Sequence, residues 1–74
     1  MQTIGIAAKT TSPEALGYAR EVGEGLRSRG LAVIYDEDMA RELGISSNTA
    51  SKANLGRESD LLITFGGDGT LLSV

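Results

Sequence analysis

Residues 61–70 read LLITFGGDGT, an apolar run followed directly by three glycines and one acid. A short apolar run with a β-branched residue predicts a parallel strand that is buried on both faces. Glycines remove Cβ atoms where a backbone turns sharply or approaches a ligand closely. Ligands of open α/β sheets bind beyond the carboxyl ends of the strands, so we expect Asp68 to stand at a ligand-binding rim.

The chemistry predicted for this glycine cluster is anion binding. Backbone N–H groups at Gly66, Gly67 and Gly69 can point into one concavity that holds phosphate oxygens without a cationic side chain. Thr70 can cap a following helix and aim the positive end of its dipole at the same place. Asp68 can accept a proton from an attacking hydroxyl, or hold Mg²⁺ directly or through water. An Asp-Gly pair between apolar runs is also typical of a hairpin turn, and that alternative stays open here.

Upstream of the cluster, the sequence predicts a strand, a helix and a second strand. Residues 3–8 form a short apolar strand, and Ser12 and Pro13 are a typical helix cap and first helical residue. Apolar residues then recur at three- and four-residue steps until Gly30, which can take a left-handed cap. Residues 31–35 form the next strand. This spacing predicts one right-handed crossover of a parallel sheet, with the first strand in a central position.

Signals are weaker between the second strand and the glycine cluster. Residues 36–38 are three successive acids, which we expect to cap a short helix that ends at Gly44 rather than to bind a metal. Residues 45–57 are polar, small and poorly periodic, so the expectation there is a surface loop or a frayed helical turn with weak or absent order. The predicted core is therefore a three-stranded parallel sheet with one firm crossover helix.

Composition limits what this chain can bind. Its 74 residues suffice for one small domain, and its net charge of −3 offers no basic patch for nucleic acid. The absence of cysteine and histidine argues against disulfides and against a zinc site. There is neither an apolar run of about 18 residues for a membrane span nor an export leader, so a soluble, cytoplasmic protein is expected.

Two common nucleotide-binding patterns are missing from the sequence. Residues 7–12 read AAKTTS where a dinucleotide fingerprint requires G-x-G-x-x-G, and no P-loop occurs. Asp36, at the end of the second strand, is therefore not assigned to a ribose. Lys9 follows the first strand at the same rim as Asp68 and is a candidate for binding a donor phosphate, although a lysine at such a place is often simply solvated.

The glycine cluster and its surroundings resemble a known family. GGDGT behind an apolar strand is similar to a signature shared by NAD kinases and diacylglycerol-type lipid kinases. Residues 4–9, 12–16, 26–30 and 59–63 follow the order and spacing of the amino-terminal lobe of NAD kinases. This resemblance covers essentially the whole chain.

The resemblance implies a fold and a reaction. The fold is a three-layer, Rossmann-like α/β lobe with a parallel sheet, in which residues 1–74 form an incomplete nucleotide-binding lobe without its carboxyl-terminal β-rich domain. The reaction is phosphoryl transfer from ATP with Mg²⁺, or from polyphosphate, to the 2′-hydroxyl of the adenosine ribose of NAD, giving NADP. Asp68 matches the family's aspartate at that hydroxyl. The residues that match the loop around the nucleotides are Gly66, Gly67, Gly69 and Thr70.

Further expectations follow from the same resemblance. The remaining family motifs would lie beyond Val74, so the chain alone is expected to be inactive, and the parent protein is expected to be a homodimer or homotetramer. Without the partner domain, Leu61, Leu62 and Leu71 would be exposed and would favour self-association. Two alternatives stay open: the corresponding lobe of a lipid kinase, and a module that binds a nucleotide without catalysis.

Overall fold

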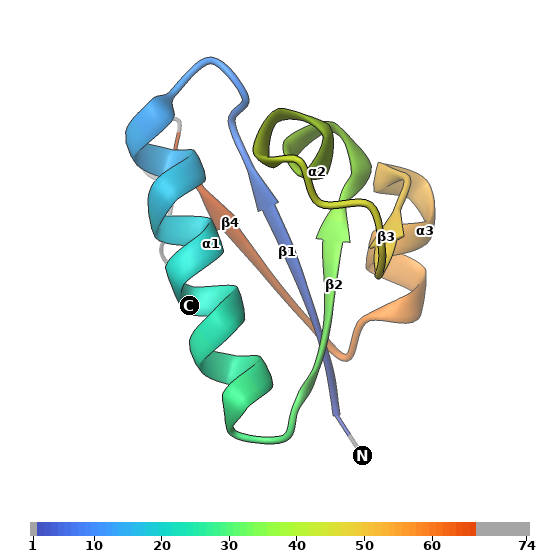
Figure 1. Ribbon diagram of the computed structural model, residues 1–74. Helices are drawn as coiled ribbons and strands as arrows, with labels where there is room; N and C mark the ends of the chain where they lie inside the picture. Colours follow the sequence, from blue (N-terminus) through green and yellow to red (C-terminus); the bar gives the residue numbers. More distant parts are fainter. Residues whose placement is uncertain (1, 67–74) are drawn as a thin grey trace.

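The computed structural model describes residues 2–66, which form a four-stranded parallel sheet with three helices (Figure 1). In chain order the elements are β1 (Thr3–Ala8), α1 (Pro13–Ser28), β2 (Ala32–Asp36), α2 (Glu37–Leu43), β3 (Thr49–Ala50), α3 (Lys52–Glu58) and β4 (Leu61–Phe65). The strand order is β3-β2-β1-β4. Strand β1 is therefore central, as predicted.

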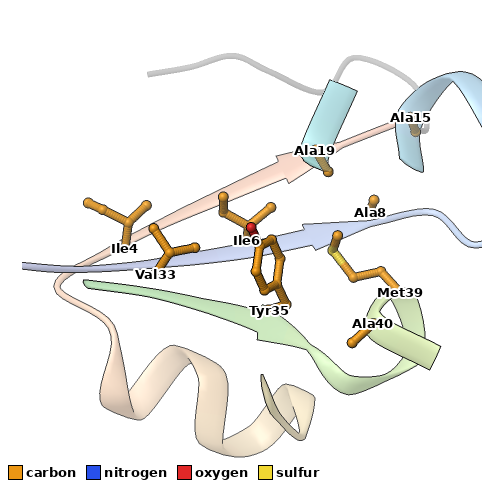
Figure 2. Close-up of a cluster of buried hydrophobic side chains, with 9 residues drawn as sticks. All are labelled: Ile4, Ile6, Ala8, Ala15, Ala19, Val33, Tyr35, Met39 and Ala40. Carbon is orange, nitrogen blue, oxygen red and sulfur yellow. The ribbon is translucent and has the colours of Figure 1, made fainter. Parts of the chain in front are cut away.

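Helices cover both faces of the sheet. Helix α1 packs against β1, β2, β4 and α2. Helix α3 packs against all four strands but makes few or no contacts with α1. Figure 2 shows the core side chains of β1 and β2 directed toward α1, with α3 on the other side of the sheet. This arrangement confirms the predicted three-layer, Rossmann-like α/β fold class. None of the helices among residues 2–66 is long and apolar enough to cross a membrane.

The ends of the first two helices are set by local sequence. The Oγ atom of Ser12 accepts a hydrogen bond from the backbone N–H of Ala15 at 3.2 Å, so α1 begins at Pro13 as predicted. Gly30 follows α1 with a φ of +90°, and Gly44 ends α2 with a φ of +76°. Both glycines supply the left-handed conformation that L side chains rarely adopt, which explains why the helices stop there. Strand β2 begins at Ala32, one residue later than predicted.

The expectation of weak or absent order over residues 45–57 is wrong. This segment contains β3, which pairs with the end of β2, and α3, which is capped by the Ser51 side chain. Helix α3 buries a single large apolar side chain, Leu55, against the sheet. One apolar contact produces no helical periodicity, so local pattern could not reveal this helix. The sheet consequently has four strands rather than the predicted three.

Gly5 in the middle of β1 makes room for α3. A Cβ atom at Gly5 would lie 3.0 Å from Cβ of Ser59 and 3.2 Å from Cγ of Leu55. The missing side chain lets the helix lie close to the strand, which compensates for the small apolar surface of α3. The Ser59 hydroxyl donates to the backbone carbonyl of Leu55 and completes the end of the helix.

The main hydrophobic core lies between α1 and the sheet, where aliphatic and small side chains from β1, β2, α1 and α2 meet around one tyrosine (Figure 2). Its buried members are Ile4, Ile6, Ala8, Ala15, Ala19, Val33, Tyr35, Met39 and Ala40. Gly23 of α1 faces the Tyr35 ring: a Cβ atom there would lie 2.7 Å from Cε1 and 2.8 Å from Cζ. The missing side chain at Gly23 therefore permits close packing of α1 on the sheet.

Adding a methyl group at Gly23 should therefore destabilise the fold, whereas the same change at Gly25 should not. Gly23→Ala forces the Tyr35 ring to move, and overpacking of this kind costs about 1–3 kcal/mol. A Cβ atom at Gly25 would meet no neighbouring side chain or strand within 4 Å. Gly25→Ala should stabilise the chain by about 0.4–1 kcal/mol, because alanine reduces the entropy of the unfolded state. Urea unfolding of the two variants measures the difference, and equal midpoints would contradict the packing explanation.

Strand β4 is less buried than its sequence predicts. The described sheet ends at this strand, and Leu61 and Leu62 are 55% and 46% exposed. Ile63 and Phe65 are half-buried against the main core. The exposed leucines confirm that an apolar surface is presented at this edge, as expected above for Leu61 and Leu62; Leu71 lies outside the described residues.

Candidate functional site

The carboxyl ends of β1 and β4 meet at one rim of the sheet. From β1 the chain passes through α1 to β2 and then outward to β3, and it returns through α3 to β4 on the other side of β1. Strands β1 and β4 therefore flank the point where the strand order reverses. Ligands of open α/β sheets bind beyond the carboxyl ends of the strands at such a switch point.

Lys9 and Gly66 lie side by side at this rim. The backbone N–H of Lys9 donates to the carbonyl of Phe65 at 3.1 Å and joins the two strand ends. Gly66 has a φ of +88°, and a Cβ atom there would lie 3.0 Å from Cβ of Lys9 and 2.9 Å from Cβ of Ala15. Both the conformation and the close approach require glycine at this position. The backbone therefore turns tightly just beyond the strand, within reach of the Lys9 side chain.

The other predicted site residues are Gly67, Asp68, Gly69 and Thr70. They lie outside the residues that the structure describes, and so does the helix expected to begin at Thr70. Their roles in binding and catalysis therefore stay predictions.

An open hollow of about 210 Å³ occupies the same rim. Its walls come from the last residues of β1 and β4, from Lys9 and from the first residue of α3. The lining residues are Ala7, Ala8, Lys9, Lys52, Thr64 and Phe65. Lys52 is the site residue that the sequence did not reveal, because it belongs to the segment predicted to be a weakly ordered loop.

Lys52 is held at the hollow by acidic side chains from the end of β2 and the start of α2. Its Nζ atom lies 3.1 Å from Oδ2 of Asp36 and 3.7 Å from Oδ2 of Asp38. The hydrogen bond to Asp36 is the main cause that raises the pKa of Lys52 above its ordinary value. Lys52 is therefore a cation at neutral pH, and 67% of its side chain remains exposed to solvent.

Asp36 itself is fully buried. Its Oδ2 atom accepts a hydrogen bond from the backbone N–H of Met39 at 3.4 Å, which confirms the prediction that the acidic run caps α2. Its Oδ1 atom is buried and has no hydrogen-bond partner among the described residues. A buried carboxylate in this state depends on its cationic neighbour, because an unpaired charge is costly to bury.

Carboxylates do not form a metal centre in the described part of the chain. Residues 2–66 contain no group of three or more acidic side chains close enough to hold a metal ion. Asp36 and Asp38, the acids nearest the hollow, are engaged by Lys52. The charged side chains that line the hollow among the described residues are those of Lys9 and Lys52, and Gly66 lies beside Lys9.

Curated relatives of this chain are NAD kinases. The chain is 40% identical over 74 residues to the NAD kinase of Syntrophotalea carbinolica, and 38% identical over 74 residues to that of Geotalea daltonii. It is 34% identical over 70 residues to the NAD kinase of Photorhabdus laumondii. These alignments cover 93–100% of the chain but only 24–26% of each relative, so the chain spans about a quarter of their length.

Two other comparisons gave no match: no family model and no solved structure matches the chain. The identity to the NAD kinases nevertheless extends along the whole chain, well beyond the GGDGT motif. It confirms the resemblance seen in the sequence. Over its whole length the chain is therefore similar to the amino-terminal quarter of these NAD kinases.

Proposed function

We propose that this chain is the amino-terminal nucleotide-binding lobe of an enzyme that phosphorylates NAD. The phosphoryl group would pass from ATP, or from polyphosphate, to the 2′-hydroxyl of the adenosine ribose and give NADP. The observation that carries this proposal is the match to NAD kinases along the whole chain. Because the chain spans only about a quarter of those relatives, the complete reaction is assigned to a longer protein that includes this lobe.

Specific roles at the rim belong to the same proposal. Asp68 would accept the proton of the 2′-hydroxyl or orient that hydroxyl for attack. The turn that surrounds the nucleotides would consist of Gly66, Gly67, Gly69 and Thr70. Lys9 would bind a phosphate of the donor, and its position beside Gly66 at the switch point supports this role. Half of the site would come from the rest of the parent protein, so we expect no turnover from residues 1–74 alone.

Magnesium would enter this site with ATP. Mg²⁺ is usually held by one or two carboxylates together with substrate phosphates, and it would neutralise charge on those phosphates. Asp36 and Asp38 do not fit as its ligands, because both are paired with Lys52. Asp68 remains the candidate carboxylate. We also propose a cytoplasmic, homo-oligomeric parent protein, and the exposed Leu61 and Leu62 offer apolar surface for further burial.

A chimeric enzyme tests the proposed reaction. Residues 1–74 would replace the matching segment of the Syntrophotalea carbinolica NAD kinase, with the unaltered relative as the positive control. We expect the chimera to form NADP from NAD and Mg-ATP. Diacylglycerol and a sphingoid base serve as alternative acceptors, because the same motif occurs in lipid kinases. A well-folded chimera that makes no NADP, or that phosphorylates a lipid instead, would refute the proposal.

A further inference from the structure

The chain has two lysines, and both line the hollow at the rim. Lys9 reaches it from the end of β1, and Lys52 reaches it from the start of α3. The five arginines of the chain do not line it. Both cations that line the hollow are therefore lysines, and two acids, Asp36 and Asp38, lie 3.1 Å and 3.7 Å from the Nζ atom of Lys52.

The hollow has the size and the walls of a site for part of a nucleotide. Its volume of about 210 Å³ is smaller than the roughly 300–1,000 Å³ of a pocket that encloses a whole small molecule. Ala7, Ala8 and Phe65 contribute apolar wall to the hollow, and Thr64 also lines it.

Asp36 fixes one of the two cations. Its carboxylate is buried and is held by the N–H of Met39, so it provides a rigid anchor for the Lys52 ammonium 3.1 Å away. An ammonium group has three N–H donors; Oδ2 of Asp36 accepts one of them at 3.1 Å, and Oδ2 of Asp38 lies 3.7 Å from the same Nζ atom. With 67% of the Lys52 side chain exposed, the remaining donors are accessible to a ligand from solvent.

We propose that Lys9 and Lys52 together bind the phosphate chain of the phosphoryl donor, and that Asp36 is the positioning residue for Lys52. The inference rests on the proposed function and adds to it a second cationic ligand from α3. Lysine binds phosphate as a flexible point charge, so two lysines that line one hollow suit a chain of phosphates. The site lies at the switch point beside Gly66, where a donor would face the glycine turn.

Titration of the 74-residue chain with tripolyphosphate and with ATP, followed by amide chemical shifts, tests this site without any need for catalysis. We expect both ligands to bind and to shift the amides of Lys9 and Lys52. Lys52→Gln should weaken both affinities at least about tenfold, because a hydrogen bond to a charged group is lost. Arg57→Gln is the matched control: it removes one positive charge from the same helix outside the hollow, and it should change affinity less than about twofold.

The inference fails if neither ligand binds, if ATP binds while tripolyphosphate does not, or if Lys52→Gln binds as tightly as Arg57→Gln. Lys52→Gln leaves the buried Asp36 without its cation and can unfold the chain. The comparison is then made in an Asp36→Asn background, where no buried charge needs a partner. The introduced asparagine retains an oxygen for Lys52, so adding Lys52→Gln to that variant should again lower affinity at least about tenfold.

Kinetics of the chimera separate this inference from the proposed function. Lys52→Gln should raise KM for ATP about tenfold and leave KM for NAD within about twofold, a difference that a general loss of structure would not produce. An active chimera with unchanged KM for ATP would refute the Lys52 role while NAD phosphorylation stands. An inactive chimera whose isolated lobe binds tripolyphosphate through Lys52 would refute NAD phosphorylation and support the phosphate site.

Discussion

Asp68→Asn is expected to lower NADP formation by the chimera about 10²- to 10⁴-fold. An amide is nearly isosteric with a carboxylate, but it cannot take a proton from the 2′-hydroxyl of NAD. Loss of one positioned acid-base group typically reduces the rate by this factor. If Asp68 acts in the transition state rather than in substrate binding, kcat falls while KM for NAD changes little. Initial rates at several NAD and ATP concentrations measure the two parameters.

The matched control for this experiment is Asp60→Asn. Asp60 immediately precedes β4, whereas Asp68 follows it, and the Oδ2 atom of Asp60 accepts a hydrogen bond from the backbone N–H of Thr3 at 2.8 Å. The asparagine oxygen can keep that bond, so Asp60→Asn should retain activity within about twofold. Wild-type turnover by a folded Asp68→Asn chimera would reduce Asp68 to a turn residue. Equal losses in the two variants would point to a stability effect instead of a chemical one.

Lys52→Met is expected to destabilise the 74-residue chain by about 3 kcal/mol. The substitution leaves the fully buried Asp36 carboxylate without the ammonium group 3.1 Å away. Breaking a buried ion pair by removing one partner typically costs about 3–5 kcal/mol. Because the Lys52 side chain is partly exposed, we expect a cost at the lower end of that range. For a chain with a total stability of about 4–11 kcal/mol, this is a large share. Urea or thermal unfolding measures it.

A second substitution distinguishes the buried charge from lost packing. In Asp36→Asn/Lys52→Met the charge itself is gone, and the asparagine side chain can still cap α2, so the double variant should be more stable than Lys52→Met alone. Arg41→Met provides the control: it removes a cation from an ion pair with Asp38 whose two side chains are 70% and 48% exposed. An exposed pair contributes about 0–1 kcal/mol. A double variant as unstable as Lys52→Met would contradict this account.

Alkaline pH should weaken the same pair. Asp36 raises the pKa of Lys52 in the folded chain above the ordinary value of 10.5. The stability contributed by this group is therefore fully present below pH 10.5 and is lost as the pH rises through the raised value. Lys52→Met lacks this contribution, so its deficit relative to the wild-type chain should shrink in the same alkaline range. Urea unfolding of both chains across that range measures the change.

Several elements could be predicted because neighbouring residues determine them. Ser12 and Pro13 specify the start of α1, Gly30 and Gly44 supply the left-handed residues that end two helices, and Asp36 caps α2. The central position of β1 followed from its short apolar run, because strands of parallel sheets are covered on both faces. These features depend on contacts between residues that are close in the sequence, so the sequence alone is enough to predict them.

The candidate site was predictable only in part. Parallel strands end at the same edge, and this rule placed Lys9 at the rim on which β4 ends. Lys52 could not be found in this way, because its segment carries no periodicity and was interpreted as a loop. Its neighbour Asp36 was correctly interpreted as a helix cap, but nothing near it in the chain indicated that it is also buried against a cation.

By itself, then, the sequence determined the parallel α/β class and the crossover unit of β1, α1 and β2, because caps and left-handed glycines mark the ends of the helices. It also determined the resemblance to NAD kinases, because the motif that carries it is uninterrupted. Only the tertiary structure decided that residues 45–57 form β3 and α3, that Gly5 makes room for Leu55, and that Lys52 meets Asp36 and Lys9 at one hollow. The physical reason is the range of the interactions. Capping and turn formation act between adjacent residues, whereas the burial of one leucine and one carboxylate acts between segments that only the folded sheet brings together.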